Sequence, residues 1–188
     1  KCVITNGTFI IEKLQNLKLG IQGQASKLTR GTGLSSYPSR GTRTEQKLDY
    51  LYVRADSTNL AQGLYKVAIE LQNDIKWTPY ETVNKALDVT NAATSMYPLN
   101  FTLEKRILSG SISQYVTSDF NSDVQTWKTG IDIEIKAGES SSQGFQFDLE
   151  NCTFTNRAGV EDVFTQTYDW KMNDNVADLG SIIKFNAI

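Results

Sequence analysis

Histidine is absent from the 188 residues, which removes the commonest general base and metal ligand of proteins. The usual catalytic triads and zinc sites that depend on histidine are excluded with it. No apolar run approaches the roughly 20 residues of a membrane-spanning helix. An apolar share of 39% with 21% charged residues is that of a folded chain. We therefore expect one domain over residues 1–188, with no enzyme activity, cofactor, metal site or membrane segment.

Cysteine is scarce as well, and its two copies leave two alternatives. Cys2 and Cys152 are far apart in the sequence, and a disulfide between them would fit a secreted protein. Because no other oxidising signature is present, two buried free thiols are the preferred interpretation. Three N-x-S/T sequons, at Asn6, Asn100 and Asn151, keep open a secreted carbohydrate-binding or adhesin-like β-sandwich module.

What the chain does contain is strand periodicity, strongest in its last third. In Thr129–Lys136 the three isoleucines Ile131, Ile133 and Ile135 fall on one face and charged residues on the other, the period of two that a half-buried strand requires. Three further segments alternate in the same way: Phe101–Val116, with a parity change that predicts a bulge near Gly110, Gly144–Glu150 and Phe164–Met172. Turn-rich separators at Ser118–Ser122, Ala137–Gln143 and Thr155–Gly159 predict that these four strands form an antiparallel meander.

The first half adds shorter strands and one helix. Asn6-Gly7 is a strong two-residue turn signal and predicts a hairpin between Cys2–Thr5 and Thr8–Ile11. Thr78-Pro79-Tyr80-Glu81 has the order of a capping box and predicts a helix over Pro79–Val89. Further strands are expected at Leu17–Gln22, Leu48–Val53, Leu64–Leu71 (where a helix is the alternative) and Leu179–Ile188. The fold class is mainly β, an antiparallel β-sandwich or barrel with one flanking α-helix.

Residues 23–47 show almost no periodicity, although a compact domain rarely contains so long a loop without a function. Residues 1–47 carry eight Lys/Arg and two acids, a net charge of +6, whereas the remainder carries −8. A basic arm on an acidic body favours self-association, since the arm of one copy can meet the body of the next. A solvated basic loop is the simpler alternative. The candidate inter-subunit residues are Arg30, Tyr37, Arg40, Arg43 and Lys47.

Four acids occupy the polar faces of two neighbouring expected strands, namely Asp132, Glu134, Asp148 and Glu150. Three interpretations are open. The acids can be solvated strand faces, which need no special role. They can be a glycosidase pair, which we disfavour because that chemistry places its carboxyl groups across a cleft rather than in rows. They can also form a wall of like charge that faces a confined space.

The order of these segments resembles that of bacteriophage tail tube proteins, the major tail protein family. The resemblance rests on Leu99–Leu103 with Ile107–Ser113, on Val116–Phe120, on Gly130–Lys136, on Glu150–Phe154, on Phe164–Trp170, and on Thr8–Leu19 followed by a long loop. It covers most of the chain and is weakest over residues 55–95.

The resemblance implies hexameric rings whose inner strands join into one continuous β-barrel and stack into a tube. Such a tube surrounds a tape-measure protein, ends at tail terminator and distal tail proteins, is assembled in the host cytoplasm and conducts viral DNA during ejection. A conduit should not hold phosphates by counterion release, so an acidic or neutral lumen is expected. Asp132, Glu134, Asp148 and Glu150 are then candidates for the lumen, or for the exterior if their strands pack the other way.

Overall fold

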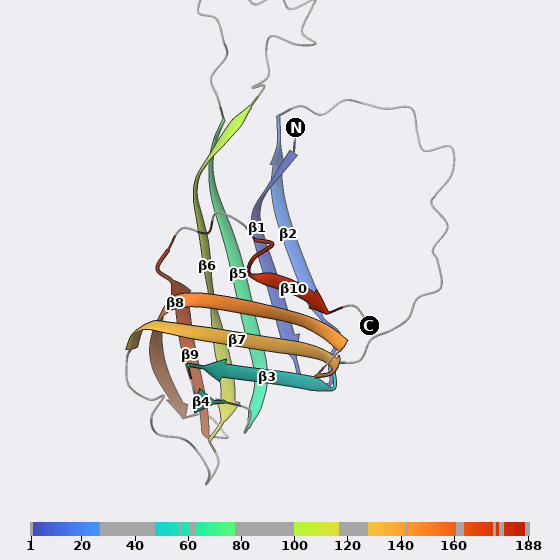
Figure 1. Cartoon of the computed structure of the whole chain (residues 1–188), viewed down its shortest axis with the longest axis vertical. Coiled ribbons are helices and arrows are strands. Elements are labelled where there is room, and N and C mark those ends of the chain that lie inside the picture. The colour runs from blue at the N-terminus through green and yellow to red at the C-terminus, as the bar shows by residue number, and fades with distance from the viewer. Residues whose placement is uncertain are drawn as a thin grey trace, which may run out of the picture.

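The computed structural model describes residues 2–26, 48–56, 58–60, 63–77, 100–116, 128–141, 143–160, 164–174, 176 and 179–186. These residues form one antiparallel sheet of ten strands that curls into a half-barrel (Figure 1). The strands are β1 (Cys2–Glu12), β2 (Lys18–Ala25), β3 (Tyr50–Ala55), β4 (Thr58–Asn59), β5 (Leu64–Trp77), β6 (Phe101–Tyr115), β7 (Lys128–Ser140), β8 (Gln143–Val160), β9 (Phe164–Met172) and β10 (Ile183–Asn186). The mainly β, antiparallel class is confirmed.

The strand order is β2-β1-β5-β6-β9-β8-β7-β3-β4, and β10 pairs with β8. β7, β8 and β9 form the expected meander. β6, however, pairs with β9 and not with β7, so the four strands have the order of a Greek key and the prediction of a simple four-strand meander was wrong. A Greek key returns the fourth strand to the first, and alternation along single strands carries no information about that return.

A corner in β8 divides the sheet into two layers. β7 pairs with β8 over Gln143–Leu149 and then, with register shifts, at Cys152 and Phe154, whereas Cys152–Val160 pairs without interruption with β9. At the corner, Asn151 has a left-handed φ of 52°, the conformation that Asn tolerates better than most residues. Figure 1 shows β8 crossing in front of β5 and β6 and then turning down beside β9. We call β2-β1-β5-β6 the tall layer, and β10, the first part of β8, β7, β3 and β4 the second layer.

The core lies between the two layers over the lower half of the tall layer. The predicted inward positions of β7 are buried, with Ile131, Ile133 and Ile135 at 4% exposure or less. From the tall layer, Phe9 contacts Phe147 of β8 edge to face, with 5.7 Å between ring centroids, a favourable aromatic geometry. The apolar parity of β9 is also confirmed, because Tyr168, Trp170 and Met172 are all buried.

The predicted Asn6-Gly7 turn was wrong. Residues 2–12 form one continuous strand, and its ladder with β2 is irregular between Ile4 and Asn6, so that Thr5 is the extra residue of a bulge. Neighbours on both sides explain the difference. β2 and β5 both pair with β1 at Asn6 and Gly7, and these ladders outweigh the local turn preference of the dipeptide.

The bulge in β6 lies at Glu104 and not near Gly110. Asp74 pairs with Lys105 and Ile75 with Leu103, which leaves Glu104 without an opposite residue. Gly110 is in regular register with Ile69 and Trp170. The change of parity along β6 is therefore confirmed, but the predicted position of the bulge was wrong. A bulge does not require a glycine, so Gly110 did not mark its place.

Three further expectations from the sequence differ from the structure in whole or in part. Thr155–Gly159, expected as a separator, lies inside β8 and pairs with Asp169–Thr165 of β9. No helix occurs in the described residues, so the flanking helix is not borne out; the range proposed for it, Pro79–Val89, lies outside them. The cysteines are free, as preferred, but only Cys152 is buried whereas Cys2 is exposed.

Candidate assembly surfaces

The tall layer has two open edges. β2 pairs only with β1, so its other side carries no strand among the described residues. β6 pairs with β9 only from Ser109 onwards; beside Phe101–Leu108 the described residues place no further strand, although Val176 N donates a hydrogen bond of 3.4 Å to the carbonyl of Arg106. Unpaired strand edges of this length are templates for another strand.

The β2 edge has little of the protection that monomeric proteins give an edge strand. All eight of its residues are exposed, including Leu19 at 52% and Ile21 at 56%. Monomers usually place several charges or a proline on such a strand, yet β2 has Lys18 as its one charge and no proline. The other ends of the described sheet are much shorter, with two residues in β4 and four in β10. The β2 edge is therefore the best-formed site for a partner strand.

The face of the tall layer that is turned away from the second layer is polar and balanced in charge. Register places its residues in rows across the strands: Lys18, Ile10, Ala68, Ser111 and Asp169; Gly20, Thr8, Glu70, Ser109 and Lys171; Glu12, Lys66, Ser113 and Thr167; Gln22, Asn6, Gln72 and Ile107; and Asp74 with Lys105. Near the upper end, Lys76 lies 3.9 Å from Glu104. Each of these charged rows contains one cation and one anion, and Lys76, which is paired with Thr102, is offset by Glu104.

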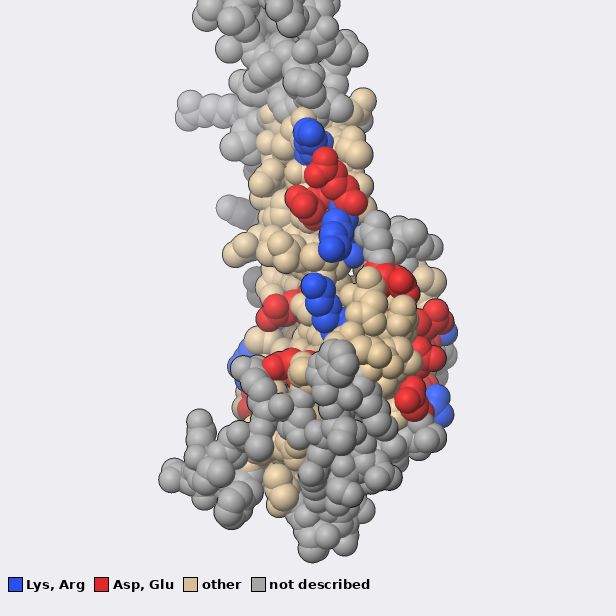
Figure 2. All heavy atoms as spheres, turned by 90° about the vertical axis from the view of Figure 1, so that its left-hand side faces the viewer, with Lys and Arg blue, Asp and Glu red and all other residues tan. Residues whose placement is uncertain are grey.

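The side of the molecule that carries β6 shows the same mixture of charges. In Figure 2, basic and acidic side chains alternate along the narrow upper part of the molecule, and neither sign forms a continuous patch there. Together with the balanced rows, this gives the tall layer little long-range attraction for a polyanion.

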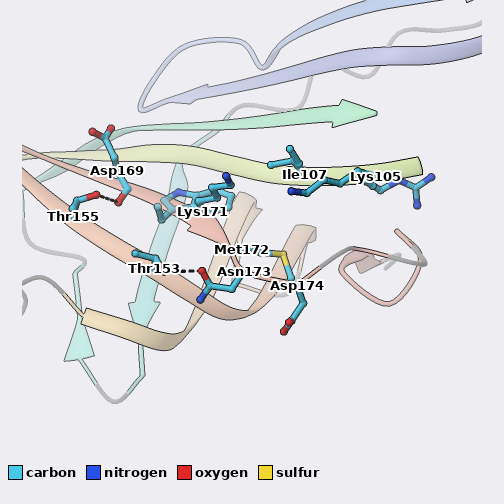
Figure 3. A pocket seen from close by; sticks show the side chains of 11 residues that line it. Lys105, Ile107, Thr153, Thr155, Asp169, Lys171, Met172, Asn173 and Asp174 are labelled. Atoms are coloured by element: carbon cyan, nitrogen blue, oxygen red, sulfur yellow. Dashed lines mark hydrogen bonds between the residues drawn. The ribbon is translucent and has the colours of Figure 1, made fainter. Parts of the chain in front are cut away.

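A hollow of about 390 Å³ lies beyond the last β6–β9 pair. Figure 3 shows Lys105 and Ile107 on β6, Lys171 and Met172 at the end of β9, and Thr153 on β8 around this space. Thr153 donates a hydrogen bond of 2.7 Å to Asn173 Oδ1. The lining includes basic Lys105, Arg106 and Lys171 as well as acidic Asp169 and Asp174, so the hollow has no clear preference for an ion. It lies next to Phe101–Leu108 of β6, beside which the described residues place no strand, and this position favours use as space for a neighbouring strand.

The four acids of the sequence analysis lie on the outer face of the second layer, where two of them are paired with cations. Glu134 is 3.1 Å from Arg54 and 2.7 Å from Lys136, and it raises the pKa of Lys136 by accepting its hydrogen bond. Asp148 is paired with Lys184.

The carboxylate of Asp148 is stabilised in its ionised form by its neighbours. Burial tends to raise its pKa, but hydrogen bonds from Lys184 and Gln146 outweigh burial, and the pKa is lowered below its ordinary value. Gln146 also bridges this carboxylate to Glu134, with Nε2 distances of 2.6 and 3.2 Å. Glu134 and Asp148 therefore belong to a surface network of mixed charge.

Asp132 takes part in the β8 corner instead. Its Oδ1 accepts a hydrogen bond from Asn151 N at 3.0 Å, and its own N–H donates to Asp56 Oδ1 at 3.0 Å. Asn151 Nδ2 donates to Asp174 Oδ2 at 2.7 Å. Within the described ranges no cluster of three acidic or cysteine ligands could hold a metal ion. The role of Asp132 in the fold is thus to hold a corner, and Glu150 is exposed next to that corner.

Several candidates from the sequence analysis have no described position. The residues of the expected inter-subunit arm lie outside the described residues, namely Arg30, Tyr37, Arg40, Arg43 and Lys47. No membrane-spanning helix occurs in the part of the chain that the structure describes. The secreted-module alternative expected an oxidised pair, whereas Cys2 and Cys152 are both free thiols.

Sequence reasoning missed both open edges and the balanced face. An open edge depends on which strands pair, and alternation within one strand does not reveal its neighbours. One signal was present, namely Leu19 and Ile21 on a strand with a single charge, which would have marked an unprotected edge had its place in the sheet been known.

Comparison with known protein families gives a match over nearly the whole chain. The model of the Bacteriophage Baseplate Tube Protein Family matches residues 1–187. No curated protein sequence matches the chain. The family match includes every described strand, and it agrees with the resemblance to phage tube proteins. The chain belongs to the bacteriophage baseplate tube protein family.

Proposed function

We propose that this protein is a structural subunit of a phage tail tube, at the part of the tube that the baseplate surrounds. As a member of a phage tube family it is a component of the virion. Its role is mechanical and not catalytic: copies join into closed rings, and the rings stack around a channel. Assembly would take place in the host cytoplasm, as for other virion parts.

The observation that carries this proposal is the pair of open edges on the tall layer. Neighbours in β2-β1-β5-β6 are antiparallel throughout, so β6 of one copy would also be antiparallel to β2 of the next. The stretch Phe101–Leu108, beside which no described strand lies, matches the eight residues of β2 in length. Every closed barrel requires a stagger between neighbouring strands. Such a stagger would align Phe101–Leu108 of one copy with β2 of the next. Closure would remove both edges.

In this ring the tall layer forms the channel wall, and its balanced polar face lines the lumen. A lumen of balanced charge would let a polyanion pass without counterion release. The acids Asp132, Glu134, Asp148 and Glu150 would then face the exterior. By analogy with the tube family, we propose six copies per ring and a tape-measure protein inside the tube. Terminator and distal tail proteins would bind at its ends, and viral DNA would pass through without sequence preference.

Electron microscopy and mass photometry over a concentration series test the proposal. We expect rings or tubes from the wild-type protein, with a channel wide enough for duplex DNA. The double variant Leu19→Lys/Ile21→Lys should fold normally, because both side chains are exposed, yet remain monomeric because charge on the edge opposes strand pairing. Glu150→Lys, an exposed change on the second layer, is the matched control and should assemble. If the edge variant formed rings as well as the wild-type protein, the proposed pairing of β2 with β6 of the next copy would be contradicted.

A further inference from the structure

The turn between β1 and β2 displays a leucine that the fold of a single copy does not explain. Leu14 is 78% exposed, the largest exposure among the large apolar residues described, and its φ of 63° is left-handed. A left-handed conformation is unfavourable for a non-glycine residue, and turns normally place Gly or Asn there. Leu14 therefore combines a strained backbone with an unburied apolar side chain, and an outlier of this kind points to a function.

The turn holds this side chain in a defined position. Lys13 N donates to the carbonyl of Tyr65 at 2.9 Å, and Leu14 N donates to the carbonyl of Leu48 at 3.4 Å. Gln15 N closes the turn on the carbonyl of Glu12 at 3.1 Å. These bonds tie the tip to β5 and to Leu48, which lies two residues before β3, so that Leu14 projects from a fixed tip.

The opposite end of the same hairpin is hollowed. A space of about 320 Å³ is lined by Cys2–Ile4 of β1 and Gly23–Ala25 of β2, which pair with each other in the ladder. Ile4 is 46% exposed there, and Cys2 is an exposed free thiol. Trp77 Nε1 donates a hydrogen bond of 2.9 Å to Gln24 Oε1 and fixes that side of the hollow. The lining is mostly apolar and backbone, which suits an aliphatic side chain.

The tip and the hollow lie at opposite ends of one hairpin, as the course of β1 and β2 in Figure 1 shows. A contact between them joins two copies head to tail. Such a heterologous contact cannot close on itself when the copies are related by translation along the strands, and it repeats into a stack. Both halves of the contact belong to this chain, and the hollow of about 320 Å³ has room for a leucine side chain, so a second copy is the occupant that fits both.

We propose that Leu14 of one copy packs into the hollow lined by Cys2–Ile4 and Gly23–Ala25 of the copy stacked on it, so that the β1–β2 hairpins run end to end along the tube. This inference rests on the proposed tube, since it identifies the axial contact between rings, whereas the β2 and β6 edges make the contact within a ring. Burial of Leu14 between copies would offset the strain of its backbone.

The native Cys2 makes a direct test available. A disulfide requires Cα atoms within about 7 Å of each other, so the variant Leu14→Cys should be cross-linked by diamide to Cys2 of the next copy. Because each chain then carries one thiol at the tip and one in the hollow, a non-reducing gel should show a ladder of dimers, trimers and longer species. The variant Leu14→Cys/Cys2→Ser should give no ladder, and Glu150→Cys, at an exposed position on the second layer, should give none either.

Each other result has one meaning. Dimers that persist without Cys2 would show a tip-to-tip contact and overturn the proposal. Tubes visible by electron microscopy without a ladder would overturn the Leu14 contact while the ring function stands. Failure of the wild-type protein to form rings would instead remove the proposed function, and the axial contact with it.

A pair of charge variants provides a second measurement that does not depend on oxidation. Leu14→Asp and Ile4→Lys should each give rings that no longer stack, because either change places one charge in an apolar contact. The double variant Leu14→Asp/Ile4→Lys pairs the two charges across the contact and should restore stacking at low salt. Stacking by Leu14→Asp alone, equal to that of the wild-type protein, would overturn the proposal.

Discussion

Gly110 lies directly against the indole of Trp170. A Cβ added to Gly110 would lie 2.6 Å from Cζ2 of Trp170 and would overlap the carbonyl oxygen of Ala68. Real Cβ atoms do not approach other atoms so closely, and Trp170 is 2% exposed, so it has no room to retreat. The glycine is required by packing between β5, β6 and β9, and not by an unusual backbone angle.

The first prediction follows from this contact. Gly110→Ala should lower the free energy of unfolding by about 2 kcal/mol or more, because an overpacked core shifts side chains and backbone. Urea denaturation followed by tryptophan fluorescence measures the change. Gly7→Ala is the matched control: its Cβ would meet nothing nearer than Leu71 at 3.7 Å, and the change should stay within about 0.5 kcal/mol. Equal losses in the two variants would show that the packing argument fails.

A second prediction concerns the corner of β8. Asn151→Ala should destabilise the protein by about 2 kcal/mol, because it removes the hydrogen bond to Asp174 and leaves a non-glycine residue at φ 52°. Asn151→Gly loses the same hydrogen bond but accepts the left-handed backbone. It should therefore be destabilised by only about 1 kcal/mol relative to the wild-type protein. Thermal unfolding of both variants decides the point. A glycine variant no more stable than the alanine variant would mean that the backbone angle has no energetic role.

The third prediction is a pH dependence at Asp148. Its folded pKa is lowered from the ordinary 3.8, so the native state binds the proton less readily than the unfolded state does. The resulting stabilisation is present above pH 3.8 and is lost as the pH falls through the lower folded value. Asp148→Asn should therefore reduce stability at pH 7 and leave it less changed near pH 2. The melting temperature across this range measures it, with the exposed Glu150→Gln as control. A constant difference at all pH values would contradict the linkage.

The two thiols provide the fourth prediction. Burial raises the pKa of Cys152 to about 12, with a further contribution from nearby Asp132, and a thiol reacts through its thiolate. At pH 8 the native protein should therefore react with one equivalent of Ellman's reagent, at exposed Cys2, and with a second only after denaturation. Cys2→Ser should abolish the native reaction. No reaction in either state would reveal a disulfide and would favour the secreted-module alternative.

Much of the fold was readable from the sequence because side-chain alternation is a local property. The strand that contains Phe164, Tyr168, Trp170 and Met172 was predicted from its alternation and is β9, and β7 contains the whole of Thr129–Lys136. Leu64–Leu71 was correctly preferred as a strand, since Gly63 and the β-branched residues oppose a helix. Burial then follows from parity, as the isoleucines of β7 show.

The errors were made where a neighbour decides the local structure. Asn6-Gly7 favours a turn in isolation, but β2 and β5 pair with it on both sides and hold it extended. Thr155–Gly159 contains turn-forming residues, yet β9 pairs with the whole segment. Ladder hydrogen bonds and cross-strand contacts add over many residues, whereas a turn preference amounts to about 1 kcal/mol or less.

The amino-acid sequence by itself determined the class of the protein: antiparallel strands, no histidine chemistry, and an order of segments that resembles phage tube proteins. Only the tertiary structure decided which surfaces remain for assembly, because an edge is open or closed according to the strands that pack beside it. The corner at Asn151, the open edge of β6 and the separation of Leu14 from the hollow at Cys2 all result from contacts between residues far apart in the chain. Such contacts depend on topology, and the period of a single strand does not encode topology.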